Sequence, residues 1–258
     1  WCSPRGHPPQ HHCRTKSGRR PQVKSVQYRV GVMFRNTFHE GGPLSIFYSL
    51  GSKPLQLWHV QQTPADAAVV DPADTSSRVE QKSIDLVRDP SIQSTVLSLR
   101  CANDALAHTF IRCPPRSDRS LGVKLPFLVL LLKSIEGGFF TFEVHIEDDQ
   151  RVTRRFRLSN YQREPRCTPL ITCVPLRLES GWNTVHVDLR ELTLTAYGSE
   201  YREAARVIIH PNCLLRRVYF TNRLSPDEEL PPELRIYAPE ECAVASSSSS
   251  PCSSSSTT

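Results

Sequence analysis

The sequence predicts an all-β protein, an antiparallel β-sandwich of jelly-roll type with one short helix. Two observations lead to this prediction. Many short segments rich in leucine, aromatic and β-branched residues follow one another through the body of the chain. Gly and Pro turn signals separate most of them, without a regular alternation of strand and helix patterns. We expect strands at residues 44–48, 55–60, 94–99, 107–112, 123–132, 139–147, 151–158, 170–178, 183–188, 205–210, 214–220 and 234–237.

The two ends differ from the body in composition. Residues 1–32 carry seven Lys or Arg residues, no acid and no hydrophobic period, and they precede Met33, the only methionine. We expect them to be a disordered basic leader outside the native protein, because they also lack the apolar core of a secretory signal. Residues 33–239 are predicted to be one domain. The serine-rich residues 240–258 are expected to be disordered, since they bury too little surface to offset their ordering entropy.

Charge and hydropathy exclude some classes of protein. The formal net charge is +6, but beyond the leader 25 basic residues stand against all 26 acidic ones. The body is thus nearly neutral, and the net charge is no indication of nucleic-acid binding. The longest apolar stretch, residues 125–132, is interrupted by Pro126 and is far shorter than the roughly 20 residues of a membrane-spanning helix. We therefore expect no membrane segment.

Residues 61–91 form the least patterned internal segment. They are rich in Ala, Asp, Ser, Thr and Pro and have almost no apolar period. This composition predicts a long exposed loop.

The clearest local pattern is a β-hairpin over residues 140–158. Apolar residues alternate with polar ones along its first strand, and Asp148, Asp149 and Gln150 are predicted to be the turn. A register in which the numbers of facing residues add to 298 places apolar residues opposite apolar residues. The predicted apolar pairs are Phe140 with Leu158, Phe142 with Phe156, and Ile146 with Val152.

That register also assigns partners to the arginines. Arg155 would face Glu143, and Arg157 would face Thr141 with its charge unanswered. Arg154 would fall on the apolar face, where it must lie near the end of the sheet or be paired. We therefore expect Arg157 to contribute more than Arg155 to binding a partner.

One helix is predicted over residues 189–197. Leu189, Leu192 and Ala196 follow a helical spacing after Asp188, which is a favourable N-cap. Gly198 supplies the stop, because glycine readily adopts the left-handed conformation that ends many helices.

No strong catalytic motif is present. The chain has no Walker loop, dinucleotide fingerprint, nucleophile elbow or zincin motif, so we predict a protein that is not an enzyme and has no cofactor. The five body cysteines, odd in number and irregularly spaced, predict free thiols and no structural zinc. Trp58 and Trp182 could serve as sugar-stacking platforms, but packing is the commoner role for such residues.

Arginine is the residue type that stands out. Residues 151–166 hold six arginines against Glu164, and residues 202–223 hold five against Glu203. One interpretation is a solvated surface that pairs with itself. The functional interpretation is a surface whose guanidinium groups bind carboxylates of acidic proteins. The alternative partner is nucleic acid, but proteins that bind nucleic acid usually carry a larger excess of positive charge. The candidate contacts are Arg154, Arg155, Arg157, Arg163, Arg216 and Arg217.

Several long strings in the body are also distinctive. The sequence closely resembles the cilia- and flagella-associated protein 20 family over nearly all of residues 33–239. The strings that carry the resemblance are MFRNTF (33–38), GSKPLQLW (51–58), LGVKLPFLV (121–129), FTFEV (140–144), RRFRLSNYQ (154–162), GWN (181–183), AYG (196–198), NCLLRRVYF (212–220) and LPPELRIYAP (230–239).

The resemblance implies a non-enzymatic role in cilia and flagella. Family members sit at the inner junction of axonemal doublet microtubules, where the B-tubule closes onto the A-tubule. The implied partners are tubulin, the parkin co-regulated protein and other inner-junction proteins. The implied location is the axoneme and basal body, with nuclear roles also attributed to members. The alternatives are a nuclear nucleic-acid-associated factor and, behind it, a carbohydrate-binding jelly roll.

This sequence departs from the family pattern in places. His59 stands where an acid is expected, Leu194 and Thr195 replace an expected basic pair on the helix, and loop 61–91 is unusually long. We interpret the chain as a divergent ortholog or a paralog.

Overall fold

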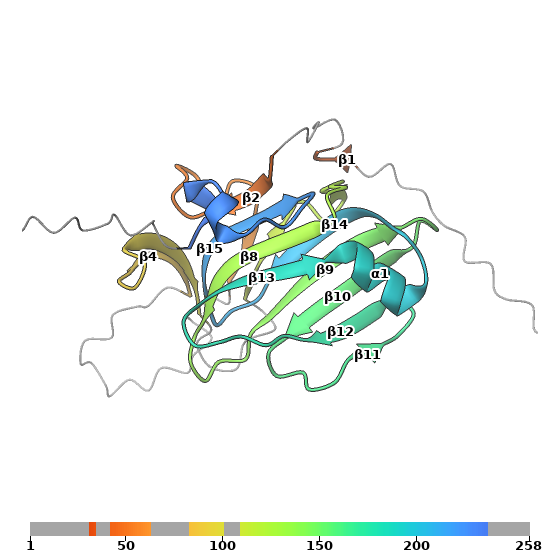
Figure 1. The fold of residues 1–258 in the computed structure, drawn as a ribbon. Coiled ribbons are helices and arrows are strands. Elements are labelled where there is room, and N and C mark those ends of the chain that lie inside the picture. The colour runs from red at the N-terminus through yellow and green to blue at the C-terminus, as the bar shows by residue number, and fades with distance from the viewer. Residues whose placement is uncertain (1–30, 35–41, 63–82, 101–108, 237–258) are drawn as a thin grey trace, which may run out of the picture.

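The computed structural model describes residues 31–34, 42–62, 83–100 and 109–236, and these residues form two stacked β-sheets (Figure 1) and a small two-stranded sheet. One α-helix, α1 (Leu189–Tyr197), follows β13. The strands are β1 (Gly31–Val32), β2 (Leu44–Tyr48), β3 (His59–Gln61), β4 (Ile84–Asp89), β5 (Ser94–Leu99), β6 (Phe110–Cys113), β7 (Arg119–Ser120), β8 (Phe127–Ser134), β9 (Thr141–Asp148), β10 (Thr153–Ser159), β11 (Arg166–Cys167), β12 (Ile171–Pro175), β13 (Trp182–Asp188), β14 (Tyr201–Ile209) and β15 (Cys213–Thr221).

Most of these strands pair antiparallel. The seven-stranded sheet has the order β11-β12-β10-β9-β14-β6-β3, with β10 and β12 parallel. The six-stranded sheet has the order β13-β8-β15-β5-β4, and β2 also pairs with β15. The predicted all-β sandwich is confirmed.

The core lies between the two sheets. Phe142, Val144 and Phe156 of the seven-stranded sheet are fully buried, as are Leu130 and Phe220 of the six-stranded sheet. All of them belong to one apolar cluster. Because side chains alternate along a strand, the residues between these core positions point to the outer faces of the sheets.

The predicted helix is confirmed together with both caps. The Asp188 carboxylate accepts hydrogen bonds from the backbone N–H groups of Arg190 and Glu191 at 3.0 and 2.9 Å. Gly198 adopts the left-handed conformation with φ of 62°, and its N–H donates to Leu194 O. Figure 1 shows α1 beside β10 and β12.

The hairpin prediction is right about its faces and wrong about its register. The numbers of facing residues add to 300, so Arg157 lies opposite Glu143 and Arg155 opposite His145. Asp148 belongs to β9 and is fully buried, and the turn consists of the three residues 149–151, with Arg151 at φ of 61°. The shift of two residues preserves which side chains point into the core.

Two of the predicted boundaries in the N-terminal half of the chain are wrong. Gly31 and Val32, assigned to the disordered leader, form β1 and pair in parallel with β7. Residues 84–89, assigned to the exposed loop 61–91, form β4 at the edge of the six-stranded sheet. Residues 63–82 of that loop, 1–30 of the leader and the whole 240–258 tail lie outside the described residues.

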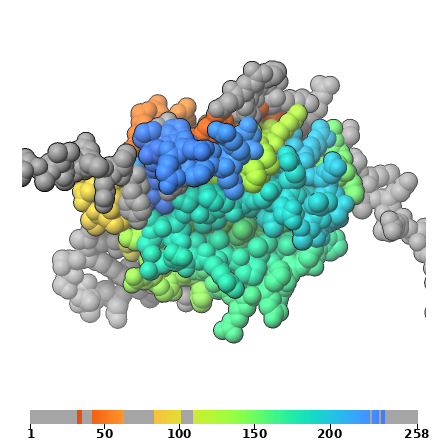
Figure 2. Space-filling model, viewed as in Figure 1, coloured from red at the N-terminus to blue at the C-terminus, as the bar shows by residue number. Residues whose placement is uncertain are grey.

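The strand predicted at 234–237 is also wrong for the residues described. Pro232–Leu234 forms a 3-10 turn, and Leu234 and Ile236 pack on the outer face of the six-stranded sheet. There they complete a second apolar cluster with Val129, Leu131 and Tyr219. Figure 2 shows the blue residues near the C-terminus directly against the teal residues from the middle of the chain.

Cysteine reactivity provides a test of the core. Cys113 and Cys213 are buried, whereas Cys167 is exposed. Burial raises the pKa of Cys113 to about 12 and raises that of Cys213 as well, so neither forms the reactive thiolate readily. We expect iodoacetamide at about pH 8 to alkylate Cys167 in the native protein within minutes, and Cys113 and Cys213 only after unfolding in urea.

Peptide mapping by mass spectrometry measures each thiol separately. Equal alkylation of Cys113 and Cys167 in the native protein would contradict the structure.

No helix within the described ranges is long and apolar enough to cross a membrane.

Candidate protein-binding face

The outer face of the seven-stranded sheet gathers positive charge. Glu143 and His145 point outward from β9, because the residues that alternate with them, Phe142, Val144 and Ile146, are in the core. Residues in register with them on the neighbouring strands share this face: Arg155 and Arg157 on β10, Arg206 on β14 and Arg112 on β6. His210, which follows β14, also contacts Glu143. We call this set the basic face: Arg112, Glu143, His145, Arg155, Arg157, Arg206 and His210.

Glu143 is the centre of the basic face. Its side chain is 5% exposed, and Arg157 contacts Oε1 through Nη2 at 2.8 Å and through Nε at 2.9 Å. Arg155 Nε is 3.5 Å from Oε2, His145 Nε2 is 3.3 Å from Oε2, and His210 Nε2 is 3.8 Å from Oε1. Burial raises the pKa of Glu143, but the histidine hydrogen bonds and Arg157 outweigh burial and hold the pKa well below its usual range.

This depressed pKa predicts a pH dependence of stability. A carboxylate whose pKa is lower in the folded state stabilises the protein above its unfolded pKa, here 4.5, and that stabilisation is lost as the pH falls below it. We expect Glu143→Gln to lower the free energy of unfolding by about 2 kcal/mol at pH 7, because the positive groups around it lose their counter-charge. The deficit relative to the parent should shrink between about pH 4.5 and pH 3.

Urea unfolding of both proteins across this pH range measures the difference. A deficit that stays constant down to pH 3 would contradict the assigned role of Glu143.

One carboxylate does not neutralise four arginines. Arg206 Nη2 donates to the carbonyl oxygens of Ser117 and Arg119 at 2.7 and 3.3 Å, which provide no negative charge. Burial, and then the charges of Arg112 and Arg155, lower the pKa of Arg206. Within the described residues, the Nε atoms of Arg112 and Arg206 are buried without a hydrogen-bond partner. The basic face therefore carries excess positive charge on a rigid sheet.

Of the six arginines predicted as contacts, the basic face includes two. Arg155 and Arg157 have side chains 38% and 40% exposed, so both reach solvent. The expectation that Arg157 is unpaired opposite Thr141 is wrong, because Arg157 makes the closer contact with Glu143 and Arg155 the longer one. Arg163 is exposed in the segment after β10.

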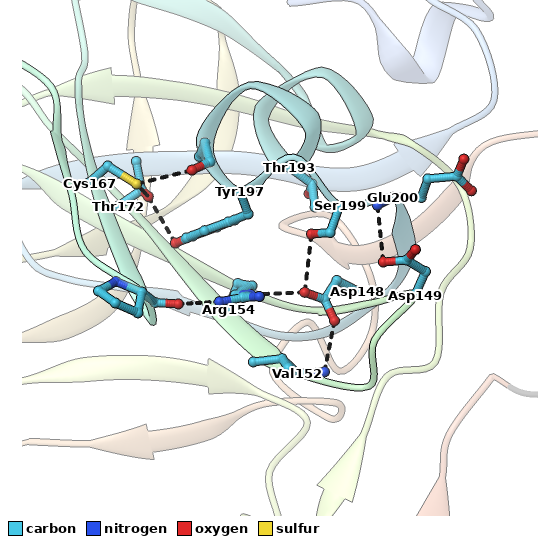
Figure 3. Close-up of polar contacts among 12 residues, drawn as sticks. Asp148, Asp149, Val152, Arg154, Cys167, Thr172, Thr193, Tyr197, Ser199 and Glu200 are labelled. Atoms are coloured by element: carbon cyan, nitrogen blue, oxygen red, sulfur yellow. Dashed lines mark hydrogen bonds and ion pairs between the residues drawn. The ribbon is translucent and has the colours of Figure 1, made fainter. Parts of the chain in front are cut away.

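Arg154 contacts groups inside the fold and does not belong to the basic face (Figure 3). Its Nε donates to the buried Asp148 carboxylate at 2.9 Å, and its guanidinium lies 4.5 Å from the centre of the Tyr197 ring. Asp148 also accepts from Val152 N at 2.8 Å and from Ser199 Oγ at 3.1 Å. Arg154 is thus paired on the inner side, as its position required, and it ties α1 to the hairpin.

Arg216 and Arg217 belong to the other sheet. Both are on β15, and Arg217 is 6% exposed with its guanidinium 3.7 Å from the centre of the Tyr48 ring. The structure therefore does not bring them to the basic face. Sequence reasoning did not name Arg112, His145, Arg206 or His210 as contacts. Strand alternation could have placed His145 beside Glu143, but pairing between β6, β9 and β14 is not visible in local sequence.

The tryptophans do not form one platform. Trp58 is buried, donates to Ile46 O at 2.8 Å and packs edge-on against Phe47. Trp182 packs with the second apolar cluster, on the outer face of the six-stranded sheet. Among the described residues, no group of three His, Cys, Asp or Glu side chains could hold a metal ion.

Fold and site define a class of protein: a β-sandwich whose seven-stranded sheet presents a positively charged outer face. The sequence profile of the CFA20 domain matches residues 33–238, and the chain belongs to this family. This confirms the resemblance seen in the sequence strings.

Three relatives show the extent of the similarity. Cilia- and flagella-associated protein 20 of Chlamydomonas reinhardtii is 42% identical over 207 residues, covering 80% of this chain and 98% of the relative. The protein of the same name from Paramecium tetraurelia is 43% identical, covering 80% of this chain and 97% of the relative. The Caenorhabditis elegans protein of that name is 42% identical, covering 80% of this chain and 92% of the relative.

Proposed function

We propose that this chain is a structural, non-enzymatic protein of cilia and flagella that binds the doublet microtubule at its inner junction. Its role there is to help close the B-tubule onto the A-tubule and so to support motility. The similarity to relatives named cilia- and flagella-associated protein 20 supports the location. The parkin co-regulated protein and other inner-junction proteins are the proposed neighbours.

The observation that carries the proposal is the excess positive charge of the basic face. Tubulin is strongly acidic, and guanidinium groups form directed, charge-assisted hydrogen bonds with carboxylates. Four arginines held on one sheet lose little conformational freedom on binding, because the neighbouring strands already restrain them. A sheet face of this kind suits a permanent contact with a repeating lattice.

The proposal is tested by expressing the tagged full chain in a ciliated cell and extracting the cilia with detergent. We expect the tag along the axoneme, and we expect it to remain with the doublets after the membrane and soluble matrix are removed. Release of the tag with the soluble matrix would overturn the proposal. So would binding of the purified protein to DNA in preference to microtubules at equal salt, which would favour the nucleic-acid alternative.

A further inference from the structure

Two large aromatic side chains stand in solvent at one end of the basic face. Phe139 is 60% exposed and Tyr161 is 49% exposed, although burial of such rings normally stabilises a fold. Their ring centres are 5.3 Å apart, and the rings meet edge-on at 75°. They form a contiguous exposed apolar pair rather than two isolated residues.

The local backbone holds this pair in place. Asn160 bridges the two segments, since it accepts from Phe140 N at 2.9 Å and donates to Gly138 O at 3.0 Å. Asn212 Nδ2 donates to Phe139 O at 3.1 Å. A side chain at Gly138 would come within 2.8 Å of Asn212, so the backbone before Phe139 packs closely against that residue. The rings are therefore exposed from a fixed position, and binding would cost little ordering entropy.

The pair continues the basic face. Thr141 Oγ1 donates to Tyr161 OH at 3.3 Å, and Thr141 lies two residues before Glu143 on the same outward side of β9. Tyr161 likewise follows Arg157 by four residues along the direction of β10. Exposed aromatic rings next to arginines are the composition enriched at the energetically dominant centres of protein interfaces.

We propose that Phe139 and Tyr161 form an apolar anchor for an acidic protein segment, in which an apolar side chain packs on the rings while flanking carboxylates bind Arg155 and Arg157. A protein is favoured over nucleic acid because the rings pack edge-on against each other and do not offer parallel faces for successive bases. The inference rests on the proposed function only for the identity of the acidic partner.

The test uses the full chain and two labelled synthetic peptides, measured by fluorescence anisotropy. Both are glutamate-rich, and one carries a central phenylalanine where the other has serine. We expect the parent to bind the phenylalanine peptide at least about fivefold more tightly, and Phe139→Ser/Tyr161→Ser to abolish that preference. Leu170→Ser, which removes an exposed apolar residue outside the pair, should keep the preference. Arg155→Ala should lower the affinity for both peptides by the same factor.

Several outcomes would overturn the anchor. These are equal affinity of the parent for both peptides, no binding of either peptide, preference for an oligothymidine strand, or a double variant that keeps the phenylalanine preference. If the double variant does not fold, Phe139→Ser alone replaces it, because the more exposed ring makes fewer internal contacts. Microtubule co-sedimentation of the parent is a separate readout: its failure alongside peptide preference would overturn the proposed function and leave the anchor standing.

Discussion

Replacement of Asp148 by alanine is expected to lower the free energy of unfolding by about 3–5 kcal/mol, the range typical of breaking a buried ion pair. Asp148 is fully buried and holds Arg154, the Val152 amide and Ser199 at 2.8–3.1 Å. Its loss leaves the Arg154 guanidinium, only 13% exposed, without its counter-charge. Urea unfolding at pH 7 measures the effect.

The adjacent aspartate provides a matched control. Asp149 is exposed in the turn and accepts one backbone hydrogen bond, from Glu200 N at 3.2 Å. Asp149→Ala should therefore cost about 1 kcal/mol or less. Similar losses for the two variants would contradict the different roles that the structure assigns to these neighbouring carboxylates.

Arg155→Ala is expected to weaken binding to microtubules about tenfold or more, with little loss of stability. A charge-assisted contact contributes on the order of 1.5–3 kcal/mol, and about 1.4 kcal/mol corresponds to a factor of ten. Arg155 is the better donor to an outside carboxylate because it lies 3.5 Å from Glu143, whereas Arg157 lies 2.8 Å away. This ranking reverses the one that follows from the sequence alone. Co-sedimentation at low and moderate salt measures binding.

Two further variants separate binding from folding. Arg157→Ala should lower the free energy of unfolding by about 1–2 kcal/mol, since it removes the closest partner of a buried carboxylate. Arg88→Ala, on the exposed β4 of the other sheet, should change neither stability nor binding. A larger binding loss for Arg88→Ala than for Arg155→Ala would place the contact on the six-stranded sheet instead.

Locally coded features could be predicted from the sequence. The helix is set by Asp188, the spacing of its apolar residues and Gly198, all within eleven consecutive positions. The strands Leu44–Tyr48 and Ser94–Leu99 match the predicted ranges residue for residue, because turn residues bound each apolar segment. The inward face of β9 follows from simple alternation.

Features set by distant contacts could not be predicted. The hairpin register depends on Asp148. Its buried carboxylate accepts a hydrogen bond from Ser199, 51 residues away in the sequence. A local pairing rule that maximises apolar contacts has no information about that bond. The edge strand β4 was not predicted, because Leu86 and Val87 are both exposed and the strand shows no alternation of buried and exposed residues. The register error is the one that left Arg157 unpaired in the prediction, whereas the structure places it opposite Glu143.

The candidate site was only partly visible for the same reason. An excess of arginine in residues 151–166 and 202–223 indicated a basic surface, and Arg155, Arg157 and Arg206 do share one. Arg154 and Arg217, although adjacent to surface positions in the sequence, point elsewhere and are mostly buried. Which arginines act together depends on the pairing of β6, β9, β10 and β14, and that pairing is a property of the whole sheet.

The central claim is that the basic face is turned toward the microtubule, and electron cryomicroscopy of doublets carrying this protein tests it most directly. We predict that the outer face of the seven-stranded sheet, with Arg155, Arg157 and Arg206, faces acidic side chains of tubulin. Density that places the outer face of the six-stranded sheet against tubulin, with the basic face open to solvent, would contradict this claim.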